Sequence, residues 1–206
     1  MVVCRIVSAP SSSRCCDGRR HVARLFVISG PSGAGKGTLI RGVLEASPDL
    51  ARVATSATTR TMRPGETDGR EYFFLSADEF DRRVGVGEFE EHVEFAGNRY
   101  GTLKSEIDGL LAGGQSVILE LEVDGSLVIK ERRPDAVLIF IDCPSDELHR
   151  RLVARQTEMA GEIADRLRIA DEQSQHKGAF DHVVVNEDVD RAVHALLTTM
   201  ERELES

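Results

Sequence analysis

Short apolar runs alternate with amphipathic segments along most of the chain. Nearly continuous apolar runs predict strands over 24–29, 116–121, 136–141 and 182–186. Helical spacing of apolar residues predicts helices over 37–46, 103–112, about 125–132, 145–155, about 161–176 and about 188–203. Continuous apolar strands separated by helices are typical of a parallel sheet that is covered on both faces. We therefore predict a three-layer α/β fold with a parallel central sheet.

The segment 52–102 breaks this alternation, and we interpret it as an inserted β-rich subdomain. Ser76 and Glu79 form a capping-box pattern at the start of a predicted helix over 76–84. The remaining predicted elements are a β-rich stretch at 52–59, a polar loop at 60–70, a strand at 71–75, and two short strands within 88–101. The chain then consists of one domain over 23–206, with its core at 23–51 and 103–206.

Composition and charge exclude some classes of partner. The chain has 206 residues, of which 41% are hydrophobic and 30% are charged, as is ordinary for a globular protein. Its net charge of −9 argues against a broad nucleic-acid-binding surface. No apolar run approaches the roughly 18 residues that a transmembrane helix needs. We therefore expect neither a nucleic acid nor a membrane as a partner.

The first residues and the cysteines bear on location. Residues 1–22 are rich in Ser, Arg and Cys and lack periodicity, so we expect a disordered N-terminal extension; a cleaved organellar transit segment is the alternative. The four cysteines have neither a disulfide framework nor zinc-site spacing, which predicts a reducing, cytoplasmic location. They are Cys4, Cys15, Cys16 and Cys143.

The segment "GPSGAGKGT" follows the first strand directly and precedes a helix. Gly30, Gly35 and Lys36 fit the pattern G-x-x-x-x-G-K, and this strand-to-helix context favours a phosphate-binding loop over a simple turn. Glycines let successive N–H groups converge on an oxyanion, and the lysine reaches the β- and γ-phosphates. The predicted ATP-binding residues are Gly30, Pro31, Ser32, Gly33, Ala34, Gly35, Lys36, Gly37 and Thr38. Gly37 stands where Ser or Thr usually ligates magnesium.

The ending "GKGT" resembles the loop of nucleoside monophosphate kinases. Together with segments 56–74, 88–102 and 151–158 and the late "VVVN", it makes residues 24–204 resemble guanylate kinase. The resemblance implies a P-loop fold with a GMP-binding insertion at 52–102 and a mobile lid at about 152–166. It also implies transfer of the γ-phosphoryl group of ATP to GMP and dGMP. The cofactor would be Mg²⁺, held by phosphates and waters near Thr38 and Glu120.

The inserted segment carries candidate acceptor-binding residues. Arg60 and Arg63 can form a guanidinium fork for a monophosphate, although a solvated charged loop is the alternative. Guanine needs an acceptor opposite its N1–H and N2–H₂ groups, and the resemblance assigns this role to Glu91. Without the resemblance, Glu91 could equally be part of a solvated acidic face formed with Glu88, Glu90 and Glu94. The resemblance adds Ser56, Glu66, Tyr72, Tyr100, Thr102 and Glu122 to the GMP-binding residues, with Thr102 donating to guanine O6.

The resemblance further implies catalytic arginines that close over the transferring phosphoryl group and exclude water. Arg151, Arg155 and Arg166 belong to the lid and its supporting helix, and join Lys36 and Arg60 as the catalytic set. Without the resemblance, Arg151 and Arg155 would be an ordinary i,i+4 pair on a helix. Asn186 would lie beside the adenine of ATP.

Three departures from the family pattern concern four positions. Glu120 and Glu122 replace aspartates spaced two apart, and alternation along a strand places both on one face. Gln156 replaces a glycine after Arg155, and Arg99 occupies a position where an aromatic residue is frequent. Two other functions are weighed: a non-catalytic guanylate-kinase-like interaction module, and a P-loop kinase with another phosphorylated acceptor. The sequence leaves the choice between monomer and homodimer open.

Overall fold

The computed structural model of the chain describes residues 22–95, 97–154 and 168–206. Its core is a five-stranded sheet in the order β2-β7-β1-β8-β9, in which every neighbouring pair is parallel. The strands are β1 (Leu25–Ser29), β2 (Arg52–Val53), β7 (Val117–Glu120), β8 (Val137–Asp142) and β9 (His182–Val185). The predicted parallel sheet is confirmed.

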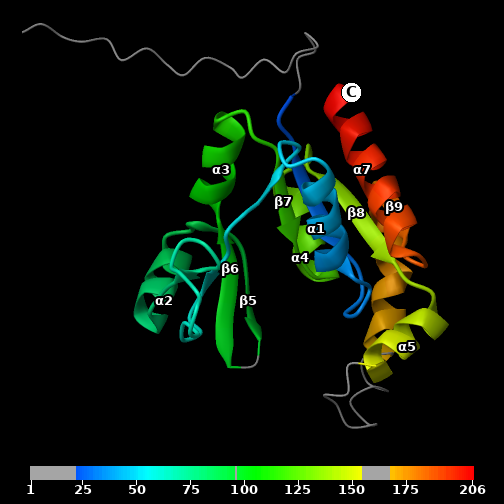
Figure 1. Cartoon of the computed structure of the whole chain (residues 1–206). Coiled ribbons are helices and arrows are strands. Elements are labelled where there is room, and N and C mark those ends of the chain that lie inside the picture. Colours follow the sequence, from blue (N-terminus) through cyan, green and yellow to red (C-terminus); the bar gives the residue numbers. More distant parts are fainter. Residues whose placement is uncertain (1–21, 96, 155–167) are drawn as a thin grey trace, which may run out of the picture.

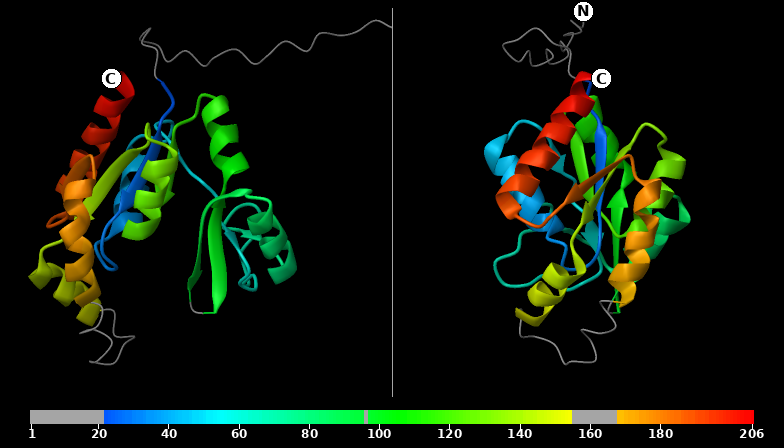
Figure 2. Two further views of the ribbon diagram at one scale, coloured as in Figure 1. Left: turned by 180° about the vertical axis from the view of Figure 1, so that it is seen from behind. Right: turned by 90° about the vertical axis from the view of Figure 1, so that its right-hand side faces the viewer.

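Helices cover both faces of this sheet, which gives the predicted three layers (Figures 1 and 2). One face packs against α1 (Lys36–Ala46) and α7 (Val189–Glu205), and the other against α3 (Lys104–Ala112) and α4 (Val123–Arg132). The remaining helical elements are α5 (Ser145–Ala154), residues 168–174, and the 3₁₀ helix η1 (Gln175–Ala179). Among the described residues, no helix is both long and apolar enough to cross a bilayer.

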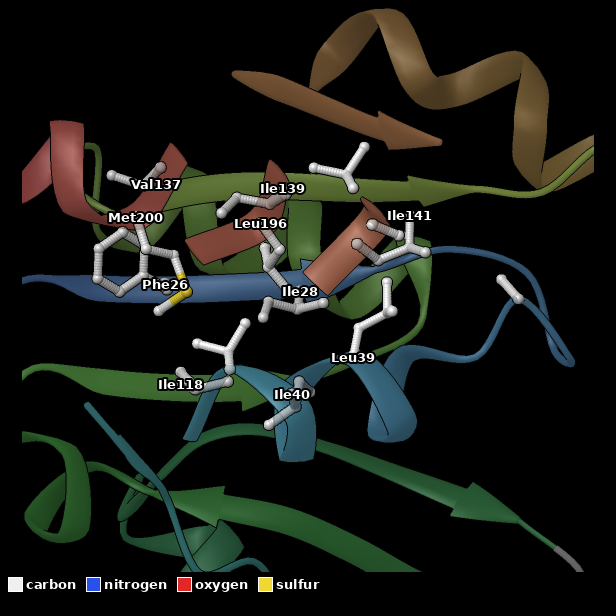
Figure 3. Packing of buried hydrophobic residues seen from close by; sticks show 14 of the residues in the cluster. Phe26, Ile28, Leu39, Ile40, Ile118, Val137, Ile139, Ile141, Leu196 and Met200 are labelled. Carbon is white, nitrogen blue, oxygen red and sulfur yellow. The ribbon is translucent and has the colours of Figure 1, made fainter. Parts of the chain in front are cut away.

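Alternation along β1 distributes its side chains between two hydrophobic clusters. Phe26 and Ile28 pack with Leu39 of α1 and Leu196 of α7 on one face (Figure 3). Leu25 and Val27 belong to the cluster on the opposite face. Because all of these side chains are buried, β1 is the centre of the core, and the segment that follows it starts from a fixed strand end.

We expect Leu196→Ala to lower the free energy of unfolding by about 2 to 5 kcal/mol, because it opens a cavity between α1 and α7. Leu196 has 0% exposure and lies in the cluster of Figure 3. Urea denaturation measures the loss, and Leu197→Ala is a matched control because Leu197 is only partly buried. Equal losses in both variants would contradict this assignment of the core.

A second sheet, in the order β4-β3-β6-β5, forms the insertion and lies beside the core sheet (Figure 1). Its elements are β3 (Ala57–Thr58), β4 (Phe73–Phe74), α2 (Ala77–Gly85), β5 (Phe89–Phe95) and β6 (Asn98–Leu103). It has a small hydrophobic cluster of its own, in which the rings of Phe80 and Phe89 stack at 4.4 Å between centroids. The insertion is therefore packed separately from the main core.

Some local predictions need correction. The predicted β-rich stretch 52–59 is divided, because β2 pairs with β7 in the core sheet whereas β3 joins the second sheet. Ala54 N still donates to Ile118 O at 3.0 Å, so the boundary predicted at residue 52 falls within the core sheet. The helix expected from about 125 begins at Val123, because Glu122 occupies the N-cap position.

Two further expectations about helices were only partly right. The capping box is half formed: Ser76 Oγ accepts from Glu79 N at 3.1 Å, but the Glu79 carboxylate binds Arg82 and Arg83 instead of reaching back. Of the helix expected over 161–176, residues 168–174 are helical and a 3₁₀ helix follows.

Several predictions lie outside the described residues. They concern residues 1–21 and the greater part of the lid, including Arg155, Gln156, Arg166 and residues 161–167.

Candidate active site

The loop between β1 and α1 has a backbone that needs glycine. Gly30, Gly33 and Gly35 have φ angles of 141°, 91° and 90°. A Cβ at Gly30 would lie 2.2 Å from the Ile141 carbonyl oxygen, so the loop approaches β8 too closely for any other residue. Gly35 caps α1 without a side-chain hydrogen bond. The first amides of α1 are thus left for an anionic ligand.

Lys36 is held over this loop by two backbone carbonyl oxygens. The residue is buried with 8% exposure, and its Nζ donates to Gly30 O at 2.6 Å and to Pro31 O at 3.3 Å. Glu122 Oε1 lies 3.8 Å from the same nitrogen. The ammonium is therefore placed where a phosphate oxygen could replace the loop carbonyls as its partner.

Two side chains support the loop from below. Asn186, which has 1% exposure, donates from Nδ2 to Ala34 O at 2.6 Å. Arg151 of α5 donates to Ala34 O at 3.4 Å and to Asn186 O at 3.1 Å, while Glu147 accepts from its Nε at 2.8 Å. Helix α5 and the end of β9 are thus joined to the loop. Asn186 lies under the loop and does not line the cleft, so its predicted place beside adenine stays a prediction.

A cleft of about 1100 Å³ separates the phosphate loop from the second sheet. It brings together predicted residues of both halves of the site, namely Pro31, Ser32, Gly33, Gly35, Lys36, Gly37, Thr38, Ser56, Tyr72, Glu91, Tyr100, Thr102, Glu120 and Glu122. Other charged or titratable residues that line the cleft were not predicted from the sequence, namely Arg41, Glu71, His92, Asp124 and Arg132. Arg132 had a weak signal as a basic residue at a helix end, but nothing indicated which strand it would face.

Glu120 and Glu122 both line the cleft, as predicted, although β7 ends at Glu120 and Glu122 is the N-cap of α4. Burial raises the pKa of Glu120, and the charge of Lys36 partly opposes that rise. A Cβ at Gly37 would lie 3.4 Å from Glu120 Oε2, so glycine at that position keeps the space beside this carboxylate open. Glu122 accepts from Gln173 Nε2 at 2.8 Å. Among the described residues, no cluster of three or more His, Cys, Asp or Glu could hold a metal ion.

The loop at 60–70 is organised around Glu66. Its carboxylate accepts from Arg60 Nη2 at 2.7 Å and from Arg63 N at 2.7 Å, and these two bonds, the Arg60 bond first, lower the pKa of Glu66. The Arg60 guanidinium lies 5.4 Å from the centroid of the Tyr72 ring, while the Arg63 side chain is exposed. Neither arginine lines the cleft, but Tyr72 and Tyr100 do, with ring centroids 6.0 Å apart.

Of the four clustered glutamates, Glu91 is the one that lines the cleft. Its Oε1 accepts from Thr102 Oγ1 at 2.9 Å. Burial raises the pKa of Glu91, whereas the bond from Thr102 and the charge of Arg132 oppose the rise. Glu90 is buried against Arg133, and Glu88 lies near Arg82 and Arg83. The solvated acidic face that the sequence left open is therefore not what the strand forms.

The position with an unusual arginine is also explained. Arg99 pairs with Asp81 of α2, and its guanidinium lies 5.9 Å from the centroid of the Phe80 ring. It therefore covers the aromatic cluster of the insertion from outside, as an aromatic side chain could.

Comparisons with known proteins agree with this geometry. A family model described as guanylate kinase matches residues 22–203. A guanylate kinase of Rubrobacter xylanophilus is 48% identical over 180 residues, which cover 87% of this chain and 94% of that protein. One from Symbiobacterium thermophilum is 44% identical over 173 residues, covering 84% and 82%. The crystal structure of guanylate kinase from Anaplasma phagocytophilum superposes with a TM-score of 0.70 at 29% identity, covering 91% of this chain and 89% of that one.

Proposed function

The chain belongs to the guanylate kinase family, and we propose that it transfers the γ-phosphoryl group of ATP to GMP and dGMP, giving ADP and GDP or dGDP. One observation carries the proposal. The glycine loop with Lys36 and the Glu91–Thr102 pair line the same cleft, so a nucleotide phosphate site and a guanine-complementary carboxylate face a shared space. An interaction module does not need the phosphate loop, and a kinase for another acceptor does not need a carboxylate complementary to guanine.

Phosphoryl transfer in this cleft relies on position and charge. The loop amides and the N-terminus of α1 would bind the ATP phosphates, and Lys36 would exchange Gly30 O and Pro31 O for β- and γ-phosphate oxygens. Arg60, Arg63 and the two tyrosines would orient the GMP phosphate as the attacking group. No covalent intermediate is needed, because holding the reactants in line supplies much of the rate.

Guanine recognition would depend on Glu91. Its carboxylate can accept from both N1–H and N2–H₂, whereas adenine has neither group and would leave the carboxylate unpaired. The Thr102 hydroxyl donates to Glu91 in this structure, so the predicted donation to guanine O6 requires that hydroxyl to rotate when the base binds.

We propose Mg²⁺ as the cofactor. The metal would neutralise charge on the β- and γ-phosphates. The residues present fit this ion, because Gly37 leaves the Glu120 carboxylate accessible beside the phosphate loop, and Thr38, which carries a hydroxyl, lines the same cleft. Phosphates and waters would supply the other ligands.

A nucleotide panel tests the function. ADP formation is measured with ATP and Mg²⁺ and with GMP, dGMP, AMP, CMP or UMP as acceptor. We expect turnover with GMP and dGMP and little with the others. Equal turnover of AMP would refute the role of Glu91, and inactivity with all five would favour the interaction module.

The raised pKa of Glu91 predicts a dependence on pH. Only the ionised carboxylate accepts from both guanine donors, so kcat/KM for GMP should fall as the pH drops through the raised pKa, above the usual range of a glutamate. The groups that act on Glu91 are the Thr102 hydroxyl from β6 and Arg132 from α4. Glu120 also has a raised pKa, so the Glu91→Gln variant serves as the reference. A persisting acid limb of the same size in that variant would contradict the assignment to Glu91.

The reaction would place the protein in purine nucleotide metabolism. We also propose the cytoplasmic location that the cysteine pattern predicted. The free, buried thiol of Cys143 supports a reducing environment.

A further inference from the structure

The strand that carries Glu91 is irregular immediately before it. The pairing of β5 with β6 shifts register between Phe89 and Glu91, which leaves Glu90 as an extra residue in a β-bulge. On the β6 side, a Cβ at Gly101 would lie 2.7 Å from the Glu91 carbonyl oxygen, so glycine makes room for the bulge. Bulges change the direction of the side chains beside them. Glu90 is thus buried with 3% exposure, while Glu91 lines the cleft.

Two consecutive arginines at the end of α4 bind the bulged residue. Arg133 donates from Nε and Nη2 to Glu90 Oε2 at 2.8 and 2.6 Å, and its Nη1 lies 2.8 Å from Asp108 of α3. Arg132 Nη1 donates to the backbone carbonyl oxygen of Glu90. The side chain and the main chain of the bulge are therefore both tied to one helix end of the core.

Removing this support would disturb Glu91 as well. A buried carboxylate that loses its ion partner has to move toward water or take up a proton. Glu90 and Glu91 share a peptide bond, so a movement of Glu90 changes the direction of the Glu91 side chain. Arg132 also lines the cleft, and its positive charge acts on Glu91 and favours the ionised carboxylate.

We propose that Arg132 and Arg133 are positioning residues for guanine recognition, which hold the bulge at Glu90 and thereby direct Glu91 into the cleft. The inference rests on the proposed function and deepens it. In this role both arginines act on guanine through the bulge and Glu91, and not by a contact of their own with either substrate.

The test is the Arg133→Met variant, assayed with GMP and with IMP as acceptors. IMP lacks the 2-amino group and so forms one hydrogen bond fewer with a well-placed Glu91 carboxylate. We expect KM for GMP to rise about tenfold, the effect of one hydrogen bond to a charged group, while KM for ATP stays unchanged. The ratio of kcat/KM for GMP to that for IMP should fall several-fold. Simple destabilisation would lower the active fraction for both acceptors and leave this ratio unchanged.

Two further variants keep the test decisive. Arg133→Lys retains the charge but cannot bind Glu90 with two donors while also reaching Asp108, so it should shift the GMP/IMP ratio in the same direction by less. If Arg133→Met fails to fold, the GMP/IMP ratio of Arg133→Lys tests the proposal in its place. Arg82→Met removes an arginine–glutamate pair from α2 in the same insertion and should leave the ratio unchanged.

The outcomes separate the two hypotheses. If the unmodified protein does not phosphorylate GMP, the proposed function fails. If it does, and both Arg133 variants keep its KM for GMP and its GMP/IMP ratio, the positioning role is overturned.

Discussion

Replacing Lys36 by methionine should lower kcat by about 10³-fold, the scale of losing one preorganised charge in the transition state, while the fold remains intact. Methionine has a similar length and removes only the ammonium and its hydrogen bonds. In this structure that ammonium is bound by Gly30 O and Pro31 O, so the loop already holds it close to where phosphate oxygens would lie. Steady-state ADP formation at saturating GMP measures the loss.

The matched control is Lys104→Met, because Lys104 donates to Gly87 O at 2.8 Å and does not line the cleft. It should retain nearly full activity. If Lys36→Met turns over nearly as fast as the unmodified protein, the loop has no catalytic role, and the non-catalytic interaction module becomes the favoured function.

Replacing Glu91 by glutamine should lower kcat/KM for GMP by about 10²- to 10⁴-fold, because up to two charge-assisted hydrogen bonds are lost. A glutamine amide can accept from only one of the two guanine donors, and it presents its own N–H group to the other. The effect should fall mainly on KM for GMP, since Glu91 lies in the inserted sheet and the phosphate loop is unchanged.

Glu94→Gln is the control for this change. Glu94 lies on the same strand, is exposed and does not line the cleft. The Glu94→Gln variant should therefore keep the kcat/KM of the unmodified protein for GMP. Equal losses in both variants would mean that acidic charge on the strand, and not a specific contact of Glu91, attracts the substrate.

Much of the architecture follows from local patterns in the sequence. The four residues 25–28 are all apolar, and a strand of this kind is typical of a sheet buried between two layers, as β1 is. The glycine spacing around Lys36 also determined the loop, because the positive φ angles at Gly30 and Gly35 are accessible to few other residues. These features depend on neighbours in the chain, and sequence patterns report such neighbours directly.

The features that could not be predicted from the sequence depend on contacts between segments that are distant in the chain. Nothing in the sequence indicates that Asn186 hydrogen-bonds Ala34, 152 positions earlier, or that Arg133 binds Glu90. The choice among four nearby glutamates likewise depends on a bulge that strand alternation alone would not place. Family resemblance selected Glu91, and the register of β5 against β6 supplies the physical reason.

The separate hydrophobic cluster of the inserted sheet has an evolutionary consequence. The cluster that contains Phe80 and Phe89 shares no side chain with the two clusters of the core sheet. Mutations that adapt this sheet to a different acceptor can therefore accumulate while the donor half keeps its packing. The junction with the end of α4 is the exception, so we expect a lineage that changes its acceptor base to change Arg132, Arg133 or Glu90 together with the strand.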